Sequence, residues 1–152
     1  MFALGETGNE KAIKVLIEAL TTNKSKNVRN IAVYALRETG NEKAIEPLIE
    51  SLITDKSNDV RESAASALGK IGNEKAIEPL IDALATSKSN NLRWNAAYAL
   101  GNIGNEKAIE PLKHALVDDG IYLGDRVKEI AFLALEKISR RIQKRIALEP
   151  TT

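Results

Sequence analysis

The chain has 152 residues, enough for one domain with its own hydrophobic core. Apolar residues make up 43% and charged residues 28% of the sequence, a composition typical of a soluble globular domain rather than a disordered one. The formal net charge of +1 gives no overall attraction to nucleic acid or anionic membranes. The absence of cysteine excludes disulfides and cysteine-based zinc sites, and we expect a cytoplasmic protein without a membrane span.

The predicted elements follow an internal repeat of 32 residues. The first element of each repeat opens with the sequence GNEKAI, which begins at Gly8, Gly40, Gly72 and Gly104. In the second copy, helical spacing places on one face the apolar residues Ala44, Ile45, Leu48, Ile49 and Leu52. A helix is therefore predicted there, with Asn41 as its N-cap. Pro47 predicts either a kink or a late start of that helix.

The second element of each repeat is also predicted to be a helix. It begins at Val28, Val60, Leu92 and Val127. In the second copy its apolar stripe consists of Val60, Ala64, Ala67, Leu68 and Ile71. This helix should end at Gly72, which can adopt the left-handed conformation of a C-terminal cap.

The repeat defines the predicted domain organisation. We expect one domain over residues 1–152, with a truncated half-repeat at 1–8, repeats at 9–40, 41–72, 73–104 and 105–139, and a basic C-terminal cap or tail at 140–152. The fourth repeat carries a three-residue insertion within 118–125, where Gly120 and Gly124 indicate a longer loop. The initial half-repeat leaves open that the chain is a fragment of a longer array. One helix pair cannot bury its apolar stripe alone, so the predicted fold is an all-α solenoid of stacked antiparallel helix pairs.

These motifs resemble the HEAT-like repeats of phycobilisome lyases, also called E-Z type repeats. The matching signature, VRxxAAxALGxIG followed by EKAIEPLI, covers nearly the whole chain from residue 2 to 139. The resemblance implies a right-handed superhelix whose second helices line the concave surface. It implies functions that range from protein scaffolds to bilin lyases, so it indicates the fold better than the activity.

Residues for catalysis are scarce. The only histidine, His114, takes a position that is acidic in the other copies, which indicates a solvated helix face. Some HEAT-like relatives, the deoxyhypusine hydroxylases, hold di-iron with repeated His–Glu pairs, and nothing here matches that pattern. No phosphate-binding or nucleophile motif is present. We therefore expect a chain that is not an enzyme and holds no cofactor or metal.

Comparison of the repeats predicts a binding surface instead. Opposite the apolar stripe of each second helix lie positions that vary from copy to copy and carry the only Trp and two of the three Tyr. Such aromatic residues dominate protein interfaces. The predicted partner-binding residues are Trp94, Tyr98, Tyr34, Ile31, Asn30, Asn95, Asn102, Glu62, Ser66, Lys70 and Leu133. The alternative is that the aromatics pack against a neighbouring repeat or the capping helix.

Two sets of basic residues have other interpretations. Arg29, Arg61 and Arg93 recur once per repeat, which favours a structural ladder that bonds loop carbonyls or acids of the next repeat. The basic residues within 137–146 alternate with isoleucines, as in a capping helix. The favoured function is a protein-interaction or scaffold module that binds a protein or peptide. The alternatives are an accessory or bilin-lyase-like subunit and, through residues 137–146, a nucleic-acid or anionic-membrane binder.

Overall fold

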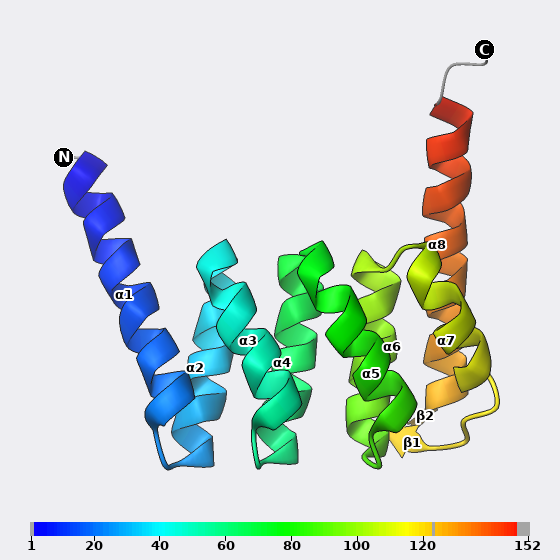
Figure 1. Cartoon of the computed structure of the whole chain (residues 1–152), viewed down its shortest axis with the longest axis horizontal. Coiled ribbons are helices and arrows are strands. Elements are labelled where there is room, and N and C mark those ends of the chain that lie inside the picture. The colour runs from blue at the N-terminus through cyan, green and yellow to red at the C-terminus, as the bar shows by residue number, and fades with distance from the viewer. Residues whose placement is uncertain (1, 123, 149–152) are drawn as a thin grey trace.

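The computed structural model describes residues 2–122 and 124–148. Its elements in chain order are α1 (Phe2–Thr22), α2 (Lys26–Thr39), η1 (Glu42–Ala44), α3 (Ile45–Thr54), α4 (Asn58–Ile71), η2 (Glu74–Ala76), α5 (Ile77–Thr86), α6 (Asn90–Ile103), η3 (Glu106–Ala108), α7 (Ile109–Ala115), β1 (Ile121–Tyr122), β2 (Asp125–Arg126) and α8 (Val127–Leu148), where η marks a single 3₁₀ turn. Successive helices run antiparallel (Figure 1). The predicted all-α solenoid of helix pairs is confirmed.

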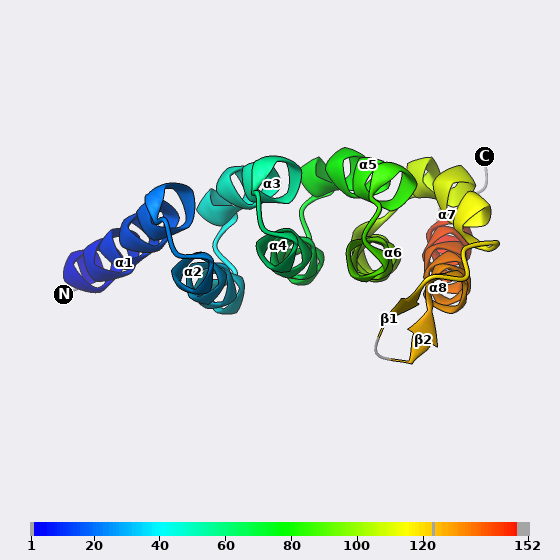
Figure 2. The same cartoon turned by 90° about the horizontal axis from the view of Figure 1, so that it is seen from below.

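The helices form two curved layers. Figure 2 shows α1, α3, α5 and α7 along the outside of the arc, with α2, α4, α6 and α8 along its inside. Each inner helix packs against the next one, α2 against α4, α4 against α6 and α6 against α8. The inner layer therefore lines the concave surface, as the resemblance implies.

A short polar signal precedes the outer helices α3, α5 and α7. The side chain of Asn41 accepts a hydrogen bond from the backbone N–H of Lys43 at 2.8 Å, and this cap opens the turn η1. The α-helix itself begins only at Ile45, so Pro47 lies in its first turn, where a backbone donor is not needed. Of the two expectations for Pro47, the late start is confirmed. At the end of α4, Gly72 adopts a φ of 81°, which confirms the predicted left-handed cap.

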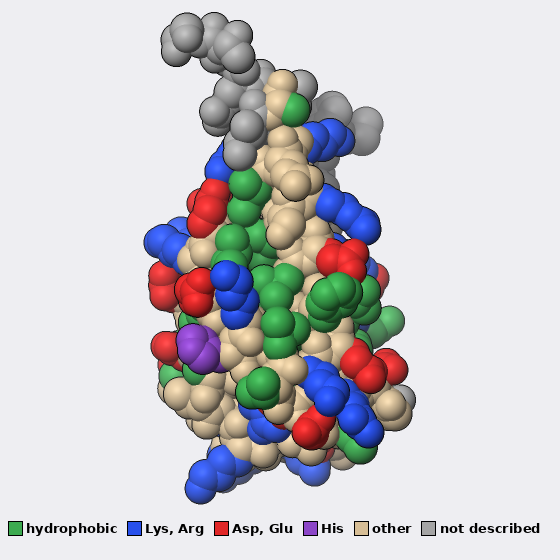
Figure 3. All heavy atoms as spheres, turned by 90° about the vertical axis from the view of Figure 1, so that its right-hand side faces the viewer, with side chains coloured by type: hydrophobic (Ala, Val, Ile, Leu, Met, Phe, Trp, Pro, Cys, Tyr) green, Lys and Arg blue, Asp and Glu red, His purple; other side chains and the backbone are tan. Residues whose placement is uncertain are grey.

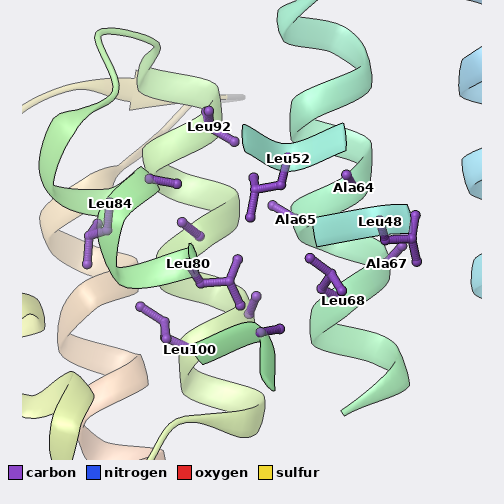
Figure 4. Close-up of a cluster of buried hydrophobic side chains, with 14 of the residues drawn as sticks. Leu48, Leu52, Ala64, Ala65, Ala67, Leu68, Leu80, Leu84, Leu92 and Leu100 are labelled. Carbon is purple, nitrogen blue, oxygen red and sulfur yellow. The ribbon is translucent and has the colours of Figure 1, made fainter. Parts of the chain in front are cut away.

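The core lies between the layers and between successive repeats. Figure 4 shows Leu48, Leu52, Leu80 and Leu84 of the outer helices facing Ala64, Ala67, Leu68 and Leu100 of the inner ones. Small residues bring the inner helices close together. A Cβ atom at Gly69 would lie 2.7 Å from the Cβ of Ala99, so only glycine fits between α4 and α6 at this point.

Two of the expected repeat boundaries do not coincide with helix ends. The helix α1 runs without a break through Gly8 and Asn9, although the same dipeptide ends α2 at Gly40. Likewise α8 continues through residues 139 and 140. Met1 and the last part of the predicted tail, 149–152, lie outside the described residues.

The insertion in the fourth repeat also differs from expectation. Instead of a plain loop, it forms an antiparallel hairpin in which Ile121 pairs with Arg126 and Tyr122 with Asp125. Gly124 in the turn has a φ of 88°, a conformation that favours glycine. The hairpin lies beneath α6 and α8 on the inner side of the arc (Figure 2). It thereby changes the surroundings of the third repeat's concave face.

Candidate functional site

Arginines at the start of the inner helices hold the concave layer in place. Arg29 donates two hydrogen bonds to the carboxylate of Asp55 in the next repeat, at 2.9 and 3.0 Å. Arg93 does the same with Asp118, at 2.6 and 3.0 Å, and Arg61 donates to the carbonyl of Leu52 at 2.8 Å. The predicted structural ladder of arginines is confirmed.

These pairs alter the ionisation of both aspartates. Hydrogen bonds from Arg93 hold the pKa of Asp118 below its usual range, against a smaller opposing effect of burial. For Asp55, burial alone would raise the pKa, but the combined hydrogen bonds and charges around it lower the pKa overall. Both carboxylates are therefore ionised at neutral pH and fix the loops that precede α4 and the hairpin.

The predicted aromatic residues lie in two different environments. Trp94 is half-buried, because Tyr98 stacks on it with ring centroids 5.6 Å apart and Tyr122 of the hairpin contacts it edge-on at 5.2 Å. Its indole N–H is buried without a hydrogen-bond partner among the described residues. Tyr34 lies on α2 and is 61% exposed. Trp94 therefore packs against Tyr98 and the hairpin, whereas Tyr34 is accessible at the surface.

A polar pocket of about 200 Å³ opens on the concave surface between α2, α4, α6 and β1. We call it the polar pocket. It is lined by Val33, Tyr34, Arg37, Glu62, Ser63, Ser66, Asn95 and Tyr122. Four of these residues, Tyr34, Glu62, Ser66 and Asn95, belong to the predicted set. Burial raises the pKa of Glu62, although Ser89 donates a hydrogen bond to its carboxylate at 3.3 Å.

A second, more apolar pocket of about 210 Å³ lies between α6 and α8. We call it the apolar pocket, and its walls include Tyr98, Ile130, Leu133, Lys137 and Arg140. Tyr98 and Leu133 are predicted site residues. The ammonium group of Lys137 lies 5.2 Å from the centre of the Tyr98 ring, a cation–π contact that leaves the ring 41% exposed.

The remaining predicted residues surround these pockets without lining them. Lys70 forms an ion pair with Glu38 at 3.0 Å, and Asn102 accepts a hydrogen bond from Lys137 at 3.2 Å. Ile31 is exposed at the N-terminal end of the stack. Asn30 is half-buried, and its side-chain oxygen lacks a partner among the described residues. The predicted single patch is thus divided in two by Trp94.

Sequence reasoning missed Tyr122 and Arg37. Tyr122 belongs to the insertion, which has no counterpart in the other repeats, so comparison of copies could not find it. The run of three apolar or aromatic residues at 121–123, between Gly120 and Gly124, was the available signal. Arg37 lies under the ring of Tyr34 at 5.6 Å, at a position that is glycine in the next two repeats.

The basic residues of α8 contact the protein itself. Arg141 donates to the carbonyls of Gly101 and Gly104 at 2.7 and 2.8 Å, which satisfies the end of α6. Arg140 pairs with Glu136, and Arg145 with Glu106. Ile138 is fully buried against the last repeat. The burial of Ile138 and the bonds from Arg141 to the end of α6 are contacts expected of a capping helix, while Arg140 and Arg145 stay largely exposed in their ion pairs.

The described residues include few side chains that could bind a metal ion. His114 is exposed, and its Nδ1 lies 2.8 Å from the carbonyl of Glu110 on the same helix. Across residues 2–122 and 124–148, no three His, Cys, Asp or Glu side chains are gathered closely enough to hold a metal ion. The His–Glu pairs of a di-iron centre are therefore not formed here. None of the described helices is long and apolar enough to cross a lipid bilayer.

Comparison with known proteins agrees with this architecture. The family of HEAT repeats matches residues 1–69 and 45–136, and the chain belongs to this family. No curated protein sequence gives a significant match. Human deoxyhypusine hydroxylase, solved in complex with glycerol, is 27% identical over 99% of this chain, with a TM-score of 0.74. A chain from the complex of CpcE and CpcF of phycocyanin lyase from Nostoc sp. PCC7120 is 26% identical over 84%, with a TM-score of 0.68.

These similarities correct one expectation. From the absence of catalytic motifs we expected that the chain is not an enzyme, and that conclusion is wrong, because both of these solved structures come from enzymes, a hydroxylase and a lyase. A repeat scaffold of this kind therefore occurs within enzymes. The present chain covers 50% and 53% of the length of those two chains, so their activities are only proposals for it.

Proposed function

We propose that the concave surface binds a segment of a partner protein. The observation that carries this proposal is the pair of exposed tyrosines, Tyr34 and Tyr98, each at the edge of a pocket on the inner side of the arc. By contrast, Leu36 and Leu100 on the apolar stripes of the same two helices are completely buried. Large aromatic rings that stay accessible beside pockets are the usual anchoring points of protein interfaces.

The two pockets suit different parts of one partner segment. The polar pocket offers hydroxyl, amide and carboxylate groups from Tyr34, Ser66, Asn95 and Glu62, which suit backbone groups or polar side chains. The apolar pocket, beside Leu133 and Ile130, suits an aliphatic or aromatic side chain. A peptide that spans both would cross the stacked rings of Trp94 and Tyr98.

The test is affinity capture from the host cell, followed by calorimetry with the purified partner. Tyr34→Ala and Tyr98→Ala should each weaken binding by about tenfold or more, since truncation of an anchoring residue costs about 1.4 kcal/mol or more. Ile53→Ala is the matched control, because Ile53 is 58% exposed on the outer helix α3. Equal affinity for all three variants would contradict the proposal.

A second candidate is a subunit that works with an enzyme partner, as in phycocyanin lyase. The similarity to a chain of the CpcE–CpcF complex favours it. In this case the concave surface would hold a chromophore or its carrier protein. Titration with free bilin should then quench the fluorescence of Trp94, the only tryptophan, and shift the visible absorption of the bilin. If neither the tryptophan fluorescence nor the bilin absorption changes, direct binding of the chromophore is excluded.

A further inference from the structure

The first and last repeats each leave uncovered a different half of the interface that joins the interior repeats. At the N-terminal end, Val28 is 37% exposed, whereas its equivalents Val60, Leu92 and Val127 are completely buried. Ala12 and Leu16 show the same change, being exposed and half-buried where the corresponding residues of the later repeats are fully buried. In the later repeats, the preceding repeat covers these positions. We call Ala12, Leu16, Val28 and Ala35 the N-terminal end face.

The C-terminal end shows the opposite pattern. Phe132 is 55% exposed, but residues at the same repeat position, Val33, Ala65 and Ala97, are buried. Leu116 and Leu135 are likewise accessible where their equivalents are buried beneath the following repeat. Figure 3 looks onto this end of the molecule and shows a band of apolar side chains with charged side chains on both sides. We call Leu116, Phe132 and Leu135 the C-terminal end face.

The charges at the two faces also match the interior junctions. Lys75 pairs with Glu46 of the preceding repeat, and Lys107 pairs with Glu78, both at 3.6 Å. The next glutamate in this series is Glu110, on the last repeat, and the first lysine is Lys11, on the first repeat. Both are exposed. A copy placed after the last repeat would bring its Lys11 to Glu110 in the same register.

Position 136 permits such a junction. Glu136 replaces the glycine found at Gly69 and Gly101, where two inner helices approach closely. The first junction, between α2 and α4, has a charged residue at the same position, Arg37, and it still packs. A junction through the C-terminal end face therefore corresponds to the first interior junction.

We propose that copies of this chain stack head to tail, with the C-terminal end face of one copy packed on the N-terminal end face of the next. The contact continues the solenoid and uses the repeat interface already formed three times within the chain. Because the two faces differ, the contact is heterologous, and nothing in it limits the assembly to two copies. The concave surfaces of successive copies then form one longer surface.

Sedimentation velocity over a concentration range of about 1 to 200 μM tests the proposal, since association follows mass action. The wild-type chain should change from monomer to dimer and longer species. Val28→Glu blocks only the N-terminal end face, and Phe132→Glu blocks only the C-terminal one. Each variant alone should stay monomeric, while an equimolar mixture should form a dimer of one copy each and nothing longer.

Both substitutions lie at accessible positions, and circular dichroism with thermal melting checks that each variant is folded. Tyr34→Ala, on the concave surface, is the control that should associate like the wild type. Glu110→Lys should weaken association about two- to fivefold, and adding Lys11→Glu should restore it. A wild-type chain that remains monomeric over the whole range, or that binds only another protein through these faces, would overturn the proposal. So would a mixture of the two blocked variants that fails to associate.

Discussion

Tyr34 and Tyr98 occupy the same position in the first and third repeats, yet their surroundings differ. Tyr34 stands 61% exposed, with the guanidinium of Arg37 as its neighbour. Tyr98 is stacked on Trp94 and approached by Lys137 of the next helix. Part of the difference lies on the helix itself, because the first repeat has Asn30 at the position of Trp94. The rest arises from the following repeat, since only the third repeat is succeeded by one with the inserted hairpin, whose Tyr122 contacts Trp94. Trp94 and the hairpin thus cover part of the concave surface at the third repeat, whereas Tyr34 stays exposed at the first.

The largest expected effect is a loss of stability at Trp94 that has no counterpart at Tyr34. Trp94→Ala should lower the free energy of unfolding by about 2–3 kcal/mol, because a half-buried indole and two aromatic contacts are lost. For a domain of this size the melting temperature should fall by about 4–10 °C. Tyr34→Ala should change stability by about 0.5 kcal/mol or less. Equal losses in thermal denaturation would show that the two positions do not differ as described.

The second prediction concerns Asp55 and Asp118, the aspartates that pair with Arg29 and Arg93. Asp118→Asn removes charge-assisted bonds with Arg93 and should cost about 2 kcal/mol at pH 7. The pKa of Asp118 is lowered in the folded state, so its contribution is complete above the unfolded value of about 4 and is lost as the pH falls through the folded value. Asp118→Asn should therefore make the acid loss of stability shallower below about pH 4.

Asp55→Asn provides the comparison in the N-terminal half, since the pKa of Asp55 is also lowered. It should flatten the acid titration in the same way. Only Asp118→Asn should alter Trp94 fluorescence, because Asp118 also accepts a hydrogen bond from the backbone N–H of Gly120 at the base of the hairpin. An equal fluorescence change in both variants would contradict a local effect of the hairpin.

The third prediction tests the hairpin directly. Tyr122→Ala removes the edge-on contact with Trp94, which should cost about 1 kcal/mol. The indole should become more accessible to water, so its emission should shift to longer wavelength and a neutral quencher should reach it more readily. Ile121→Ala, at the exposed neighbouring position of the same strand, is the matched control. A fluorescence maximum that stays unchanged in Tyr122→Ala would mean that another group shields Trp94.

The same division separates the features that the sequence predicts from those that it does not. The framework was predictable because Ala, Leu and Gly recur every 32 residues and each copy repeats the same packing problem. The exposure of Tyr34 was predictable for the same reason. The environment of Trp94 was not, because Tyr122 occurs once and its fold depends on a hairpin turn at Gly124. The missing break at Gly8 shows the same limit. A Gly–Asn pair ends α2 at Gly40, which adopts a φ of 62°, but the identical pair lies inside the continuous helix α1.

The smallest expected effect concerns Glu62, which lies in the polar pocket beside Tyr34 and Tyr122. Burial raises its pKa, and the nearby charge of Asp59 adds to this, so the folded state binds the proton more tightly than the unfolded chain does. The ionised carboxylate therefore opposes folding at pH values above the raised pKa, and this cost disappears as the pH falls through it.

Glu62→Gln keeps an acceptor for Ser89 but removes the charge. The melting temperature at pH 7 should rise by about 1–2 °C, and the gain should vanish near pH 4, where the wild-type carboxyl is already protonated in part. Glu50→Gln, at an exposed position of α3, is the control for the removal of one surface charge. A lower melting temperature for Glu62→Gln at pH 7 would show instead that the charge of Glu62 stabilises the junction between α4 and α6. In that case the carboxylate in the polar pocket would stabilise the fold, rather than being kept there at a small cost in stability.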